Sequence, residues 1–207
     1  GERFASDVSV GSPLWVRLVR TGDTFAGYYS TDGSNWTPGT GDGENGGVTV
    51  DMAETILIGI AASSYSSTPG TAIVDDFEVC PLGADAETCQ AYSDDFDDGV
   101  ITDWIDLDIG NPLPGSSSES GGSITVNGDG TSIWGTNDSF HYTYKQVQGS
   151  FVATINIQDV PDTAEFAKAG LMLRASTDPG SAQVMLVNAR DSGIQFASRE
   201  DDGDSTN

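Results

Sequence analysis

Apolar and polar residues alternate along much of the chain in short runs, and clusters of Gly, Asp, Ser and Asn separate these runs. In the segment 14–22 (LWVRLVRTG), side chains at odd positions would lie on one face of an extended chain and those at even positions on the other. A second run begins after the turn at 21–23, and Asp32-Gly33 supplies the positive φ that a hairpin turn needs. The first third of the chain is therefore predicted to form a β-meander.

Further strand-like segments follow this meander. The unbroken apolar run 54–63 (ETILIGIAAS) is typical of a strand buried in a sandwich, and 70–80 (GTAIVDDFEVC) is another predicted strand. Later strands are expected within 123–135, 139–160, 167–176 and 182–199, with a polar loop at 110–122 and an acidic tail or loop at 199–207. No long stretch repeats apolar residues at helical spacing, so the pattern predicts an all-β protein.

Composition narrows the classes of partner. The 207 residues suffice for one ordinary domain or two small ones, and 32 Asp+Glu against 8 Lys+Arg give a net charge of −24. Such a surface repels nucleic acid and anionic membranes and attracts divalent cations, although most of the carboxylates are expected to be a solvated acidic surface. We see no signal peptide and no apolar run of membrane-spanning length, so we expect no nucleic-acid partner, no membrane insertion, and a mature, processed or excised segment.

The two cysteines, Cys80 and Cys89, flank the Pro- and Gly-containing turn segment 81–88. In an extracellular protein this spacing favours a local disulfide that clamps a linker. Two free thiols are the alternative. A metal site is disfavoured because the sequence holds no other Cys and a single His.

Three segments together resemble a known family: 15–38 (WVRLVRTGDTFAGYYSTDGSNWTP), 132–155 (SIWGTNDSFHYTYKQVQGSFVATI) and 167–187 (AKAGLMLRASTDPGSAQVMLV). They look like the concanavalin A-like (laminin-G-like) jelly-roll domains of secreted bacterial proteins. The resemblance covers most of the chain. It implies a β-sandwich of two antiparallel sheets.

The order of these segments differs from that of the family, in which the segments matching 132–174 come first and those matching 15–80 come last. Residues 1–79 are thus expected to be the C-terminal half of a jelly roll, 80–92 a Cys-flanked interdomain linker, and 93–207 the N-terminal half. The half 93–207 would be completed by residues 1–79 of the same or an adjacent copy. Three arrangements stay open: a tandem repeat cut mid-domain, subunits that exchange strands head-to-tail, and a circular permutant that closes on itself.

An acidic cluster is expected where the halves meet, because the first and last strands of this fold class lie side by side. The carboxylates concerned are Asp75, Asp76, Asp95, Asp97 and Asp98. Dense oxygen ligands of this kind suit Ca²⁺, so a calcium site is predicted here, with Phe77 and Phe96 pointing into the core. The alternative is a solvated acidic edge that prevents unwanted strand pairing.

Aromatic residues offer a second candidate site, since an aromatic ring can stack on the C–H face of a sugar. Trp36, which follows a turn, and Tyr65, in a predicted loop, are the candidates for sugar stacking, while most other aromatics are expected to fill the core. Asn35 and Asn137 lie in N-x-S/T sequences near predicted turns and are candidate glycosylation positions.

Catalysis has little support in the sequence. The single histidine, His141, lies in a predicted strand, and Glu165 has no second carboxylate at the spacing that glycosidases of this fold class use. We therefore predict that the chain is not an enzyme. The expected function is a structural repeat or subunit of an extracellular filament or large cell-surface repeat protein, with copies of itself as partners. The alternative is a carbohydrate-binding module of a secreted glycoside hydrolase or adhesin, with polysaccharide as partner.

Overall fold

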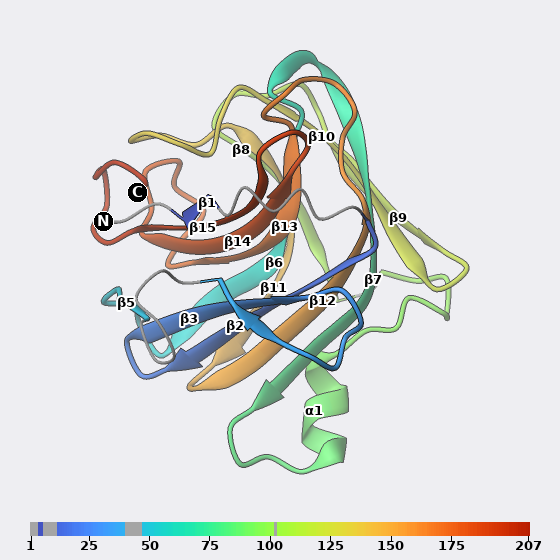
Figure 1. Ribbon diagram of the computed structural model, residues 1–207, viewed down its shortest axis with the longest axis vertical. Coiled ribbons are helices and arrows are strands. Elements are labelled where there is room, and N and C mark those ends of the chain that lie inside the picture. The colour runs from blue at the N-terminus through green and yellow to red at the C-terminus, as the bar shows by residue number, and fades with distance from the viewer. Residues whose placement is uncertain (1–3, 6–11, 40–46, 102) are drawn as a thin grey trace.

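Two antiparallel β-sheets pack face to face in the computed structural model of the chain, which describes residues 4–5, 12–39, 47–101 and 103–207 (Figure 1). The first sheet has seven strands. Their order is β1 (Phe4–Ala5), β15 (Gly193–Arg199), β14 (Gln183–Ala189), β13 (Lys168–Arg174), β6 (Thr55–Ser63), β11 (Phe140–Gln148) and β8 (Ile105–Ile109).

The second sheet has eight strands. Seven follow the order β4 (Thr37–Pro38), β3 (Thr24–Ser30), β2 (Leu14–Thr21), β12 (Phe151–Asp159), β7 (Ser66–Pro81), β10 (Ser123–Gly130) and β9 (Ser116–Ser120), and β5 (Val48–Thr49) pairs with β3. The prediction of an all-β sandwich of two antiparallel sheets is confirmed.

Strands from the two segments 1–79 and 93–207 alternate within both sheets. β6 lies between β11 and β13, and β7 lies between β10 and β12. β2 pairs with β12, and β1 pairs with β15. The two segments of one chain therefore build a single core together.

Alternation along the strands decides which side chains enter that core. On β6, Ile56, Ile58 and Ile60 face the other sheet and join the main apolar cluster, with exposures of 1% or less. Leu57 and Ala61 lie on the opposite face of the same sheet in a second apolar cluster. Both faces of β6 are thus buried, which explains why its sequence is an unbroken apolar run.

Three elements differ from the sequence prediction. Ser116–Ser120 forms the edge strand β9 inside the segment predicted as a polar loop, because its backbone pairs with β10 although its side chains are polar. The segment 80–92, predicted as a linker, contains the helix α1 (Ala86–Tyr92), whose N-cap is Asp85. Residues 93–98, expected from the family resemblance to be the first strand of the jelly roll, make one isolated bridge, Phe77 to Asp94, beside β7.

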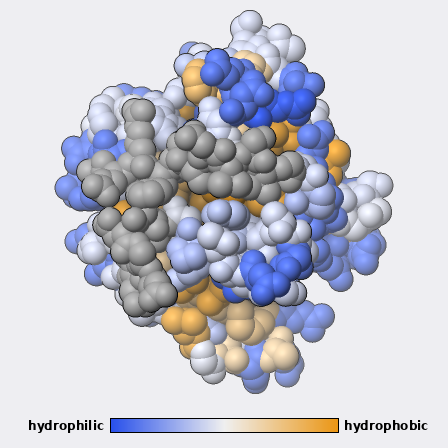
Figure 2. All heavy atoms as spheres, in the orientation of Figure 1, coloured by the Kyte–Doolittle hydropathy of each residue, from blue (hydrophilic) through white to orange (hydrophobic). Residues whose placement is uncertain are grey.

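The molecule has two distinguishable ends (Figure 1). The connection from β6 to β7 lies at the upper end of the view, and α1 projects from the lower end of β7. Figure 2 shows hydrophobic residues gathered near that lower end, where Leu82 is 50% exposed.

Candidate functional site

A cleft of about 450 Å³ lies at the upper end of the sandwich, where the connections β6–β7, β8–β9 and β10–β11 meet. Its volume falls within the range of small-molecule sites, roughly 300–1,000 Å³. The lining combines one aromatic ring, hydroxyl and amide side chains, and one carboxylate. The described lining residues are Tyr65, Ser66, Ser67, Asn111, Pro112, Leu113, Asp129, Gly130, Thr131 and Ser139.

Asp129 holds the three connections together at this cleft. Its Oδ1 accepts a hydrogen bond from Ser64 Oγ (3.1 Å) and another from the Gly130 amide, and its Oδ2 accepts from the Leu113 amide (3.0 Å). The residue is 5% exposed, so these hydrogen bonds take the place of water around its carboxylate. Two carboxylate oxygens offer about four lone-pair sites, which leaves acceptor capacity beyond the three bonds.

Tyr65 presents its ring at the rim of the cleft from an unfavourable backbone conformation. Its φ is +50°, a region that costs a bulky residue about 1–3 kcal/mol. The preceding residue fixes this conformation, because Ser64 bonds to Asp129 on one side and its carbonyl accepts from Thr163 Oγ1 (2.6 Å) on the other. The surrounding structure thus holds an aromatic ring that is 42% exposed in a strained position, an arrangement often found at binding sites.

Neighbouring groups orient this ring further. Phe166 meets Tyr65 edge to face with 5.2 Å between ring centroids, and Phe166 is itself 39% exposed. Lys168 Nζ lies 5.4 Å from the Tyr65 centroid and 5.4 Å from that of Trp134, and it donates to the Phe166 carbonyl. Burial lowers the pKa of Lys168 to about 8.

Trp36, the other predicted stacking residue, is in a different situation. The Arg17 guanidinium lies 3.7 Å from its ring centroid, so one face of the indole is already covered within the molecule. Trp36 lies just before β4, in the eight-stranded sheet. Tyr65 and Trp36 belong to separate surfaces, and the cleft of Tyr65 is the better candidate site.

The predicted acidic cluster is partly assembled. Asp76, Asp95 and Asp98 line one open cleft of about 380 Å³, and the lining does not include Asp75 or Asp97. Burial and the nearby charges of Asp75, Asp95 and Asp97 raise the pKa of Asp76. The electrostatic conditions for a cation are therefore present.

A coordination sphere is not formed by these carboxylates. Asp75 Oδ2 accepts from Gln158, while Asp75 Oδ1 is buried with no partner in the described part of the chain. Among the described residues, no three His, Cys, Asp or Glu side chains come close enough to hold a metal ion. The residues fit the charge of Ca²⁺ but not its ligand geometry, so calcium binding stays a prediction.

The remaining predicted positions lie apart from the Tyr65 cleft. Cys80 and Cys89 form a disulfide that joins the end of β7 to α1. Asn35 and Asn137 are both exposed, as glycosylation requires, and Asn35 Nδ2 donates to Asp32 (2.7 Å). Phe77 and Phe96 are fully buried, as predicted.

His141 is a structural residue in this fold. It is 1% exposed, and its two ring nitrogens lie 2.8 Å from Asp108 Oδ1 and 3.3 Å from Asp106 Oδ1. Burial raises the pKa of the Asp106 carboxyl, but hydrogen bonds from Ser117 and Thr143 outweigh burial and bring the pKa below its usual range. Because β8 and β9 belong to different sheets, the bond from Ser117 to Asp106 joins the two sheets at this edge.

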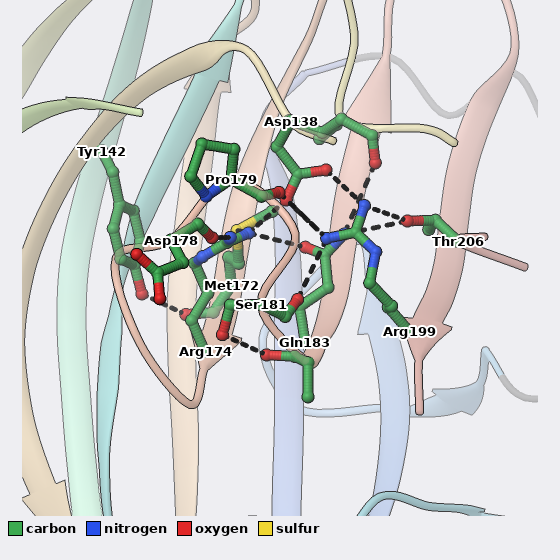
Figure 3. A network of polar contacts seen from close by, with 12 residues as sticks. Asp138, Tyr142, Met172, Arg174, Asp178, Pro179, Ser181, Gln183, Arg199 and Thr206 are labelled. Carbon is green, nitrogen blue, oxygen red and sulfur yellow. Dashed lines mark hydrogen bonds and ion pairs between the residues drawn. The ribbon is translucent and has the colours of Figure 1, made fainter. Parts of the chain in front are cut away.

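A buried ionic network at the end of the seven-stranded sheet was not anticipated from the sequence (Figure 3). The carboxylate of Asp138 accepts from both Arg174 and Arg199, and all three side chains are 0% exposed. Arg199 also donates to the carbonyls of Gly135 and Ser181, which anchors two loops to β15. The sequence gives little indication of this network, because each arginine is only the last residue of an apolar strand.

Asp129, Phe166 and Lys168 are likewise residues that sequence reasoning missed. Asp129 stands in a Gly-rich segment, and the role of its carboxylate depends on loops distant in the chain. No described helix is long and apolar enough to cross a membrane. Comparison with protein-family models and with curated proteins finds no match for the chain.

Proposed function

We propose that the chain is an extracellular β-sandwich module that binds a saccharide in the Tyr65 cleft. The observation that carries this proposal is an exposed aromatic ring, fixed in a strained backbone conformation, beside a buried carboxylate and several hydroxyl and amide side chains. A saccharide offers the matching chemistry. Its C–H face packs against a ring, and its hydroxyl groups both donate and accept hydrogen bonds.

The polar groups are placed to serve those hydroxyls. Asp129 retains acceptor capacity within the lining of the cleft, and the lining residues Asn111 and Thr131 are exposed. Recognition would thus divide between apolar stacking on Tyr65 and hydrogen bonds from loops that Asp129 holds in place. No catalytic step is part of this proposal.

The experiment is isothermal titration of the folded chain with a panel of neutral oligosaccharides built from glucose, galactose, mannose, xylose or N-acetylglucosamine. Tyr65→Ala should weaken binding at least tenfold, about 1.4 kcal/mol, while Tyr65→Phe should retain most of it because the ring remains. Trp36→Ala is the matched control and should leave the affinity unchanged. No binding anywhere in the panel, or loss with Trp36→Ala instead, would contradict the proposal.

A second candidate function is a structural repeat or subunit of an extracellular filament or large cell-surface protein. The observation behind it is that strands from 1–79 and 93–207 depend on one another in both sheets, where they pair within one chain. Residues 93–207 of one copy, completed by 1–79 of the next, would keep every strand pair while linking copies head-to-tail. Light scattering after size-exclusion chromatography tests this, with species at multiples of 21.6 kDa expected and a strictly monomeric chain contradicting it.

A further inference from the structure

The Tyr65 cleft carries an unbalanced charge. Asp129 is the one carboxylate in its described lining, and that lining includes no Lys, Arg or His side chain. The carboxylate is 95% buried by its neighbours, since it is 5% exposed, so solvent screens it little. A ligand group entering the cleft would therefore meet negative potential that no lining cation offsets.

Lys168, the cation beside Tyr65, does not alter this conclusion. Lys168 is 4% exposed, donates to the Phe166 carbonyl and faces the rings of Tyr65 and Trp134. It is not part of the cleft lining and so offers no donor to a ligand there. The net charge of −24 adds a long-range field of the same sign as Asp129.

We propose that the Tyr65 cleft selects saccharides without negative charge, prefers amino sugars, and rejects uronic-acid polymers. This inference rests on the proposed saccharide function and adds the ligand's charge class to it. An ammonium group near Asp129 gains a charge-assisted hydrogen bond, which is about twice as strong as a neutral one. A uronate would have to lose water beside a carboxylate of like charge, with no donor to compensate.

The test uses matched tetrasaccharides that differ in charge and keep their ring faces. The gluco set is glucose, glucosamine and glucuronic acid, and the galacto set is galactose, galactosamine and galacturonic acid. Titrations at about 20 mM salt should show amino-sugar binding about 3–10-fold tighter than neutral binding, and uronate binding at least tenfold weaker. At 0.5 M salt the amino-sugar advantage should fall only in part, because the long-range field of the net charge is screened while the buried carboxylate of Asp129 is screened little.

Two variants locate the charge responsible. Asp129→Asn removes the cleft carboxylate, while Asp23→Asn makes the same change of net charge in the exposed β2–β3 turn, remote from the cleft lining. The amino-sugar advantage should disappear in Asp129→Asn and persist in Asp23→Asn. If Asp129→Asn does not fold, as its thermal midpoint would reveal, the amino-sugar advantage of the unmodified chain at 0.5 M salt decides, because a short-range contact with Asp129 keeps part of it.

The outcomes separate the two ideas. Uronates that bind as tightly as neutral sugars, an advantage lost completely at 0.5 M salt, or equal effects of the two variants would overturn the charge selection and leave saccharide binding intact. Failure of all six tetrasaccharides to bind would overturn both.

Discussion

Replacing Asp138 by Asn removes one charge from the middle of the molecule while keeping the shape of the side chain. Arg174 and Arg199 are both fully buried and both bond to this carboxylate (Figure 3). In the described part of the chain, no other carboxylate forms an ion pair with either arginine. The substitution therefore leaves two buried guanidinium groups without an opposite charge.

The cost follows from the burial of the network. Breaking a buried ion pair by removing one partner typically costs about 3–5 kcal/mol. Two arginines share Asp138, which favours the upper part of this range. Backbone carbonyls that accept from the arginines, such as those of Asp178 (2.6 Å) and Asp204 (2.9 Å), would still solvate the guanidinium groups in the variant. These bonds favour the lower part of the range. We expect a loss of about 3–5 kcal/mol and a thermal midpoint lower by roughly 6–20 °C.

Urea unfolding followed by tryptophan fluorescence and circular dichroism measures this loss. The matched control is Asp162→Asn, which breaks the exposed ion pair of Asp162 with Arg190 (3.0 Å) and should cost at most about 1 kcal/mol. The reasoning would be refuted if Asp138→Asn and Asp162→Asn lowered the free energy of unfolding by the same amount.

Three further predictions concern other groups. The pKa of Lys168 is lowered to about 8 from 10.5, so the unfolded chain binds more protons between these values and stability should rise with pH. Urea unfolding at pH 7 and at pH 9.5 should show a rise of about 2 kcal/mol that comes from Lys168 and is absent in Lys168→Met. An equal rise in the variant would contradict this. Replacing Cys80 and Cys89 together by Ser opens a short loop with a sequence separation of 9 and should lower the free energy of unfolding by about 2–3 kcal/mol. Hydrogen exchange in α1 should become faster. Unchanged exchange there would contradict the view that the disulfide holds the helix against β7. If the acidic cluster binds Ca²⁺ structurally, EDTA should lower the thermal midpoint by about 5–10 °C, and an unchanged midpoint would exclude this role.

Much of the fold was predictable from the local alternation of apolar and polar residues along the chain. The buried face of β2 follows from the alternation of its apolar residues, and the burial of both faces of β6 follows from its unbroken apolar run. Phe77 and Phe96 were assigned to the core correctly. The strand β9 could not be found like this, because Ser116–Ser120 contains no apolar residue and owes its conformation to pairing with β10. The helix α1 has no buried residue, so it leaves no apolar periodicity to detect.

The candidate site was predictable only in part. Tyr65 could be named because an aromatic residue among serines suggests an exposed ring. Its partners could not, since Asp129 and Phe166 reach it through strands far apart in the sequence. Trp36 looked the better candidate in the sequence because it follows a turn, and only the structure shows that Arg17 covers one face of its ring.

The most direct test of saccharide binding in the Tyr65 cleft is a two-dimensional amide NMR spectrum recorded during titration with the tightest-binding neutral oligosaccharide. The account predicts shifts confined to the three connections of the cleft, at Tyr65–Ser67, Asn111–Leu113 and Asp129–Thr131. Shifts centred on Trp36 and the strands β3 and β4, with the cleft unchanged, would contradict it.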